Sequence, residues 1–178
     1  MKSGLHFTGL RSAIAILLAL GILFRFINLD RKLYWYDETL TSLRISGHTQ
    51  TELVEQVFNG RVISVKELQQ QYQYPNPDKT LKDAINAFAG NAEHSPLYYL
   101  MARFWVQFFG NSVTAIRSLS ALISLLALPC IYWLCLELFE SSITGWVAVL
   151  LISISPFHVL YAQQARQYSL WTVAILLA

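Results

Sequence analysis

The stretch LYWYDETLTSLR, residues 33–44, places two adjacent carboxylates, Asp37 and Glu38, among aromatic side chains. An apolar segment ends just before this stretch, and a long polar segment follows it. A charged side chain where a membrane helix meets water costs free energy, so its presence there suggests a function. The acid pair therefore marks a boundary in the chain and is the first candidate for a functional site.

The composition is that of a membrane protein. Of the 178 residues, 54% are hydrophobic and 13% are charged, whereas about a quarter of the residues in a soluble domain are charged. The formal net charge is only +2 and no run of Lys or Arg occurs, which argues against nucleic acid as a partner. Cys130 and Cys135 lie in one hydrophobic run and are predicted to be buried side chains rather than a disulfide or a metal set.

Four apolar segments are predicted to be membrane spans, at about residues 10–29, 113–139, 143–161 and 169–178. For the first, a cleaved signal peptide is the alternative, but the apolar run continues past Ala19 through Phe24. The fourth is much shorter than the roughly 20 residues that a span needs. We therefore expect a polytopic, all-α helical membrane protein of which this sequence is an N-terminal fragment.

Residues 30–112 form a long polar loop, which is expected to be helical because loops of this length without structure are uncommon. Short helices are expected at 38–46, 50–58, 64–73 and 79–89. A further helix is expected over residues 96–109, with Ser95 as the N-cap, Pro96 in the first turn and Gly110 at the end. At 1.5 Å per residue it is too short to cross a hydrocarbon core of about 30 Å, so it should lie on the membrane surface.

This arrangement of spans brings three polar groups to one face of the membrane. Asp37 and Glu38 follow the first span, and Glu93-His94 close the loop. Arg166 and Tyr168 lie in the turn after the third span. If residues 96–109 crossed the membrane, the last pair would lie on the opposite face and the group would not assemble.

The residue types in this group suit the displacement of a phosphate leaving group. Asp37, in a partly apolar setting, could act as a general base towards a hydroxyl. Arg166 or Arg103 could hold the phosphate, because the planar guanidinium matches its oxygens. Glu38, Glu93 and His94 could supply hard ligands for a divalent metal ion.

Each of these residues also has a purely structural interpretation, and the residues alone leave both open. Asp37 could be the N-cap of a helix over 38–46, with Glu38 in its first turn. Glu93-His94 could be a solvated pair ahead of Ser95. Arg166 could be an interfacial side chain that reaches towards water.

Three motifs in this order resemble a known family: WYDE at 35–38, HSPLYY at 94–99 and QQARQYSL at 163–170. The chain is similar to the N-terminal part of GT-C membrane glycosyltransferases, among them the protein O-mannosyltransferases and the aminoarabinose transferases. In many of these relatives two prolines in a row stand where this chain has His94-Ser95-Pro96.

The resemblance implies an extracytoplasmic active site in a plasma membrane, here the inner membrane of a bacterium. It implies a sugar on a polyprenyl phosphate as donor and a hydroxyl on a lipid, glycan or protein as acceptor, with transfer by inverting displacement. Asp37 matches the family's catalytic base, and Glu38 matches its partner. Glu93 and His94 match a region near the metal or donor phosphate, and Arg166 and Tyr168 match a turn near the donor.

The alternative is a non-enzymatic membrane protein, such as a transporter or an assembly subunit. Transporters typically carry charges at broken helices near the middle of the bilayer. In this sequence the charges gather near the ends of the predicted spans, which favours the enzyme.

Overall fold

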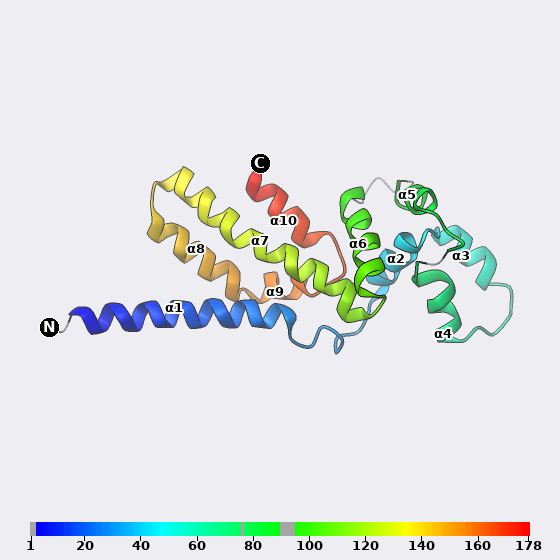
Figure 1. Cartoon of the computed structure of the whole chain (residues 1–178), viewed down its shortest axis with the longest axis horizontal. Coiled ribbons are helices and arrows are strands. Elements are labelled where there is room, and N and C mark those ends of the chain that lie inside the picture. Colours follow the sequence, from blue (N-terminus) through cyan, green and yellow to red (C-terminus); the bar gives the residue numbers. More distant parts are fainter. Residues whose placement is uncertain (1–2, 76, 90–94) are drawn as a thin grey trace. The chain divides into compact units, whose positions relative to one another are not determined.

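The computed structural model describes residues 3–75, 77–89 and 95–178, with side chains from Ser12 onwards. Every regular element in this part of the chain is a helix, as the all-α prediction requires (Figure 1). The helices form two compact units. Unit 1 contains residues 1–29, 120–164 and 168–178, and unit 2 contains residues 30–119 and 165–167.

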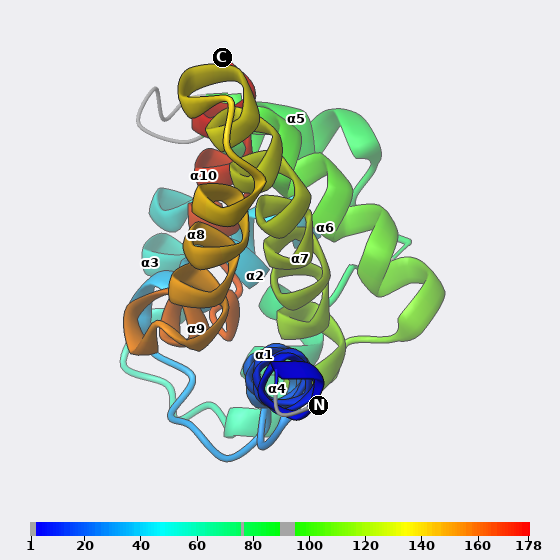
Figure 2. The ribbon, with the colours of Figure 1, turned by 90° about the vertical axis from the view of Figure 1, so that its left-hand side faces the viewer.

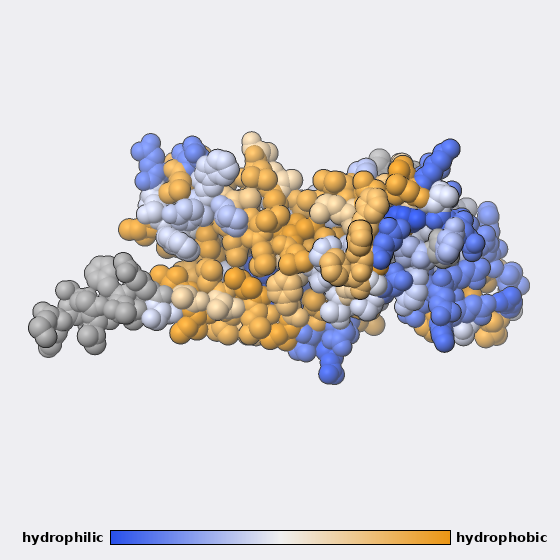
Figure 3. All heavy atoms as spheres, viewed as in Figure 1, coloured by the Kyte–Doolittle hydropathy of each residue, from blue (hydrophilic) through white to orange (hydrophobic). Residues whose placement is uncertain are grey.

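Unit 1 contains the apolar helices, and the face of them that Figure 3 shows is mostly hydrophobic. They are α1 (Ser3–Phe26), most of α7 (Val113–Phe139), α8 (Ser142–Ile154), α9 (Pro156–Ala162) and α10 (Tyr168–Leu177). In the described residues α7 alone is long and apolar enough to cross a membrane, and α8 with α9 makes a second such segment if the bent pair counts as one span. Residues 12–26, the part of α1 whose side chains are described, and residues 168–177, which are α10, are shorter apolar helical segments.

The predicted third span, residues 143–161, is wrong as a single helix. The structure divides it into α8 and α9, which meet at a bend of 60°. Ser155 lies between them with an extended backbone, and Pro156 begins α9. Proline has no N–H to continue the helix and disfavours helical geometry in the residue before it, which explains the break.

The helix α1 packs closely against α8, and Figure 2 views α1 down its axis. A Cβ atom added at Gly21 would lie 2.4 Å from the carbonyl oxygen of Ser153. Only glycine allows the two backbones to come this close. Arg25, one turn further on, donates hydrogen bonds to the same part of α8.

Unit 2 contains the helical loop. Its elements are α2 (Tyr36–Ser46), α3 (Gln50–Val57), α4 (Val65–Leu68), the π-helix η1 (Gln69–Gln73), α5 (Leu81–Ala89), α6 (Pro96–Phe109) and the start of α7. The four short helices predicted for the loop are therefore present, and the third is divided between α4 and η1. The helix predicted over 96–109 has those bounds, with Gly110 at its C-cap.

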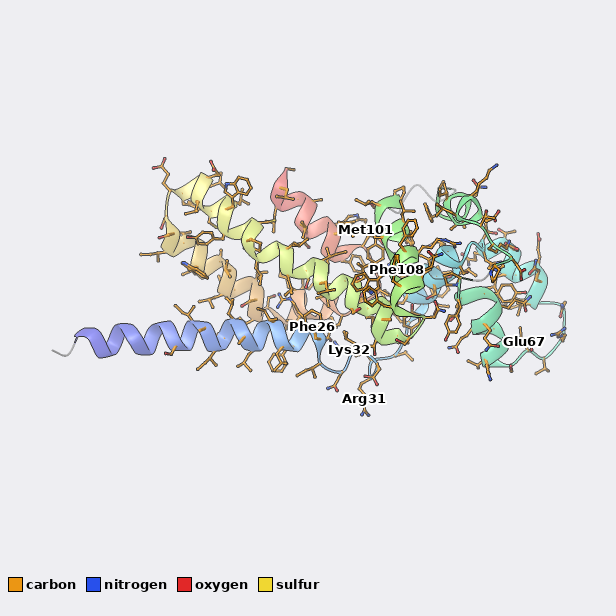
Figure 4. All side chains as sticks on the ribbon, viewed as in Figure 1. Phe26, Arg31, Lys32, Glu67, Met101 and Phe108 are labelled. Atoms are coloured by element: carbon orange, nitrogen blue, oxygen red, sulfur yellow. The ribbon has the colours of Figure 1, made fainter. Side chains whose placement is uncertain are left out.

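The helix α2 is the centre of unit 2, because α5, α6 and η1 all pack against it. Its residues from Thr41 to Ser46 are all buried. On α6, in contrast, Leu97, Phe104 and Phe108 are exposed apolar side chains, and Figure 4 labels Phe108. This apolar surface is compatible with the prediction that α6 lies on a membrane surface, which stays a prediction.

Candidate active site

The acid pair lies in the first turn of α2, where the positive end of the helix dipole favours carboxylates. The N-cap is Trp35, whose carbonyl accepts the first helical hydrogen bond, from Thr39, at 3.0 Å. Asp37 is therefore already inside the helix, and the alternative that made it the N-cap is wrong. Both acids are held in place by a regular helical turn.

Glu38 is completely buried and is bound by an arginine that the sequence analysis did not single out as a site residue. The Nε and Nη2 atoms of Arg117 donate to its two carboxylate oxygens at 2.8 and 2.6 Å. The backbone N–H of Ala165 donates to Glu38 Oε1 at 2.7 Å. Bidentate, charge-assisted contacts of this kind are among the strongest hydrogen bonds in proteins.

Arg117 also binds the segment that leads into α2. It donates to the backbone carbonyls of Lys32 and Leu33 at 3.1 and 2.9 Å, and its guanidinium lies over the ring of Tyr34. Side chains of Arg31 and Lys32 extend into solvent from this segment (Figure 4). One feature of the sequence could have indicated a role for Arg117, because its charge lies close to the start of a long apolar segment.

Asp37 has a different environment, although it is the neighbour of Glu38. About 30% of its side chain is exposed, and among the described residues its ion pair is a loose contact of 3.7 Å between Oδ2 and Arg166 Nη2. The prediction that Asp37 and Arg166 come together is confirmed, across 129 residues of sequence. Asp37 is thus a carboxylate with room to receive a proton from a ligand.

Arg166 is buried rather than interfacial, so the alternative of an exposed side chain reaching towards water is wrong. Its Nη1 atom donates to the Tyr99 hydroxyl at 3.3 Å and lies 3.4 Å from the Asp37 carbonyl. The residue immediately before it, Ala165, is the one whose N–H binds Glu38. Glu38 therefore anchors the short segment that carries Arg166 to Asp37.

Arg103 is also buried, and the hydrogen bonds described for it go to backbone carbonyls. Its guanidinium donates to the carbonyl of Ile45, near the end of α2, and to that of Lys79 at 3.0 Å. This geometry favours a role in holding α6 against α2. The prediction that Arg103 holds a phosphate is not tested by these contacts.

The structure does not place the remaining predicted residues relative to this group. Tyr168 belongs to unit 1, where its ring packs edge-on against Tyr161. Glu93 and His94 lie outside the described residues. Within residues 3–75, 77–89 and 95–178 no cluster of three or more His, Cys, Asp or Glu side chains is arranged to hold a metal ion, so the predicted divalent metal stays a prediction.

Residues 93–178 match the family model described as dolichyl-phosphate-mannose-protein mannosyltransferase. Over this part, the chain is similar to the GT-C glycosyltransferases. The match favours an enzyme over the transporter or assembly subunit considered above. Searches of the curated proteins and of the solved structures gave no match.

The matched part of the chain carries Arg117, Ala165 and Arg166, whereas the acid pair lies ahead of it. In unit 2 the acid pair therefore contacts residues of the matched part. The matched part supplies the groups that bind Glu38 and the guanidinium beside Asp37.

Proposed function

We propose that this protein transfers a sugar from a polyprenyl-phosphate carrier to a hydroxyl acceptor, with inversion at the anomeric carbon. The observation that carries the proposal is the contact of Asp37, a partly exposed carboxylate, with the buried Arg166. The family match supports a glycosyltransferase. The carrier, the acceptor class and the inversion come from the resemblance and from the chemistry of this pair.

In the proposed reaction Asp37 takes the proton from the acceptor hydroxyl while the acceptor oxygen attacks the anomeric carbon. The bond between that carbon and the phosphate oxygen breaks on the opposite side, and the carrier phosphate leaves with the electron pair. We assign Arg166, the cation paired with Asp37, to the departing phosphate, because a guanidinium can stabilise its negative charge. A single displacement needs no covalent intermediate with the protein.

Glu38 has a different part in this proposal from the catalytic role that the sequence suggested. Its oxygens are already occupied by Arg117 and the Ala165 N–H, so a substrate would have to displace buried, charge-assisted bonds to reach it. We assign it a positioning role. It fixes the segment that carries Arg166, while Asp37 carries out the proton transfer.

We place the reaction at the extracytoplasmic face of the membrane, with α1, α7, α8–α9 and α10 as spans or parts of spans. The support is the apolar character of these helices and the membrane association of the GT-C family. The bacterial inner membrane remains the proposed location.

The test is Asp37→Asn in the full-length protein, assayed in membranes with polyprenyl-phosphate sugars. The carboxamide keeps the shape of the side chain but cannot accept the proton, so transfer should fall by about 10²- to 10⁴-fold. Asp30→Asn is the matched control, because Asp30 is an exposed acid outside the site. Full transfer by Asp37→Asn would exclude Asp37 as the base.

A further inference from the structure

Unit 1 contains a cavity of about 290 Å³, and its lining does not include Asp37, Glu38 or Arg166. Its lining comes from α1, α7, α8, α9 and α10, and most of it is apolar or aromatic. Among its polar residues are Arg25, His158 and Ser169, but it includes no Asp or Glu. The cavity is therefore an apolar space with a cation in its wall and no acid to balance it.

Arg25 is buried to 1% exposure, and every hydrogen bond described for it goes to a neutral carbonyl. It donates to the carbonyls of Gly21 at 2.6 Å, Ser153 at 2.8 Å and Ile152 at 3.1 Å. Its Nε–H is buried and has no hydrogen-bond partner. A buried donor without a partner is uncommon and costs stability.

The end of α8 offsets only part of the charge on Arg25. Ile152 and Ser153 lie in the last turn of that helix, where the dipole amounts to roughly half a negative charge. A guanidinium inside a set of apolar helices needs further compensation, and charges in such places generally mark a functional site. An anion in the cavity would provide it.

We propose that this cavity binds the phosphate-bearing end of a lipid, with the phosphate at Arg25 and the first carbons of the chain against the apolar lining. Arg25 supplies the charge, and Ser169 and His158 supply polar groups in the same wall. A volume near the lower end for ligand pockets suits a head group with the start of a chain rather than a whole lipid. The proposal rests on the membrane location proposed above, but not on the chemistry of Asp37.

Two lipids share this chemistry, an anionic phospholipid of the bilayer and a polyprenyl phosphate. The test is native mass spectrometry of the purified full-length protein, titrated with phosphatidylglycerol, with undecaprenyl phosphate and with diacylglycerol, which lacks phosphate. We expect both phosphate lipids to be retained at least tenfold better than diacylglycerol. Stronger retention of undecaprenyl phosphate would identify the carrier as the ligand, and equal or stronger retention of phosphatidylglycerol would identify a bilayer lipid.

Two variants test the location of the site. Arg25→Met should abolish the preference for phosphate, but it also removes the bonds to α8 and could impair folding. Ala127→Leu adds volume at a buried position of the cavity wall without changing Arg25, and it should reduce retention of both phosphate lipids several-fold. Leu126→Phe, which enlarges an exposed neighbour on the same helix, is the control and should bind as the wild type does.

Equal retention of diacylglycerol, or unchanged retention of both phosphate lipids by the folded Ala127→Leu protein, would overturn the proposal. Asp37→Asn separates this proposal from the proposed function. It should lose transfer and keep its bound lipid, because Asp37 belongs to unit 2 and does not line the cavity. Loss of the bound lipid from this variant would contradict the cavity site, whereas intact transfer with the lipid retained would contradict the proposed function alone.

Discussion

At the scale of single residues, two adjacent acids have opposite environments. Glu38 is fully buried and makes short bonds to Arg117 and Ala165, whereas Asp37 is partly exposed and has one loose ion pair. Helical geometry causes the difference, because neighbouring residues point about 100° apart around the axis. One side chain can therefore enter the protein while the next faces a substrate.

This difference predicts opposite responses to the loss of each charge. Glu38→Gln should destabilise the folded protein by about 3–5 kcal/mol, because it removes the charge that pairs with the buried Arg117. Asp37→Asn should change stability by less than about 1 kcal/mol, as expected for a loose and partly exposed pair. Thermal unfolding of the purified full-length proteins measures both changes.

A double variant, Glu38→Gln with Arg117→Met, provides the control, because it removes the uncompensated charge. It should recover part of the lost stability. The positioning role of Glu38 would be refuted by a Glu38→Gln protein that is as stable as the wild type and has normal transfer.

At the scale of helices, close backbone contacts and ion pairs decide how the elements pack. In unit 1, Gly21 lets α1 lie so close to α8 that a Cβ atom at this position would clash with the carbonyl of Ser153. In unit 2, Glu52 of α3 receives a hydrogen bond from Lys79 at 2.6 Å. Both contacts join segments that are distant in the sequence.

Gly21→Ala should force α1 and α8 apart and destabilise the protein by about 1–3 kcal/mol, as overpacking commonly does. Ala19→Val is the control, because it enlarges an exposed side chain of the same helix. The midpoint of thermal unfolding in detergent is the measurement, and equal midpoints for the two variants would show that the helices can adjust.

The Glu52–Lys79 contact should make unit 2 sensitive to acid. Burial by itself raises the pKa of Glu52, but the hydrogen bond from Lys79 and the nearby charges of His48 and Lys79 outweigh it, so the pKa lies below its ordinary value of 4.5. A depressed pKa stabilises the folded form above about pH 4.5, and this stability is lost as the pH falls through the folded-state pKa.

Hydrogen exchange of the amides in α3, measured at pH values above and below 4.5 and corrected for the intrinsic rate, tests this sensitivity. Lys79→Met should remove most of the pH dependence and lower protection by the equivalent of about 0.5–1 kcal/mol at pH 7. The expectation fails if the variant and the wild type lose protection in parallel as the pH falls.

At the scale of the whole molecule, the chain folds as an apolar unit and a polar unit. The apolar unit contains the predicted spans, and the polar unit holds Asp37 together with Arg166. The chain passes repeatedly between the units, so residues 165–167 return to the polar unit after three apolar helices. The spans proposed above, α1, α7, α8–α9 and α10, follow the order in which the chain enters the apolar unit.

Side-specific labelling tests that count in intact cells that express the full-length protein with Cys130 and Cys135 replaced. Tyr36→Cys, beside the acid pair, should react with a membrane-impermeant maleimide from outside. Glu140→Cys, in the exposed turn between α7 and α8, should react only after permeabilisation. Labelling of both from outside would require a different number of spans.

The sequence by itself determined the helices, because their signals are local. Apolar runs, the Ser95-Pro96 start and the Gly110 end predicted α6 and α7 to their bounds. Even the acid pair and its association with Arg166 could be predicted, from the order of the spans and the family motifs. The break at Ser155-Pro156 was missed, although its cause was also local, because the apolar run continues through it.

Only the tertiary structure decided which of the two acids is available to a substrate. Glu38 and Arg117 are 79 residues apart, and Arg25 meets α8 across 128 residues. Hydrophobic periodicity shows which face of a helix is buried but not which side chain it will meet there. The partners of Glu38 and Arg25 depend on how distant helices pack, so burial, charge pairing and the cavity beside Arg25 became visible only in the folded chain.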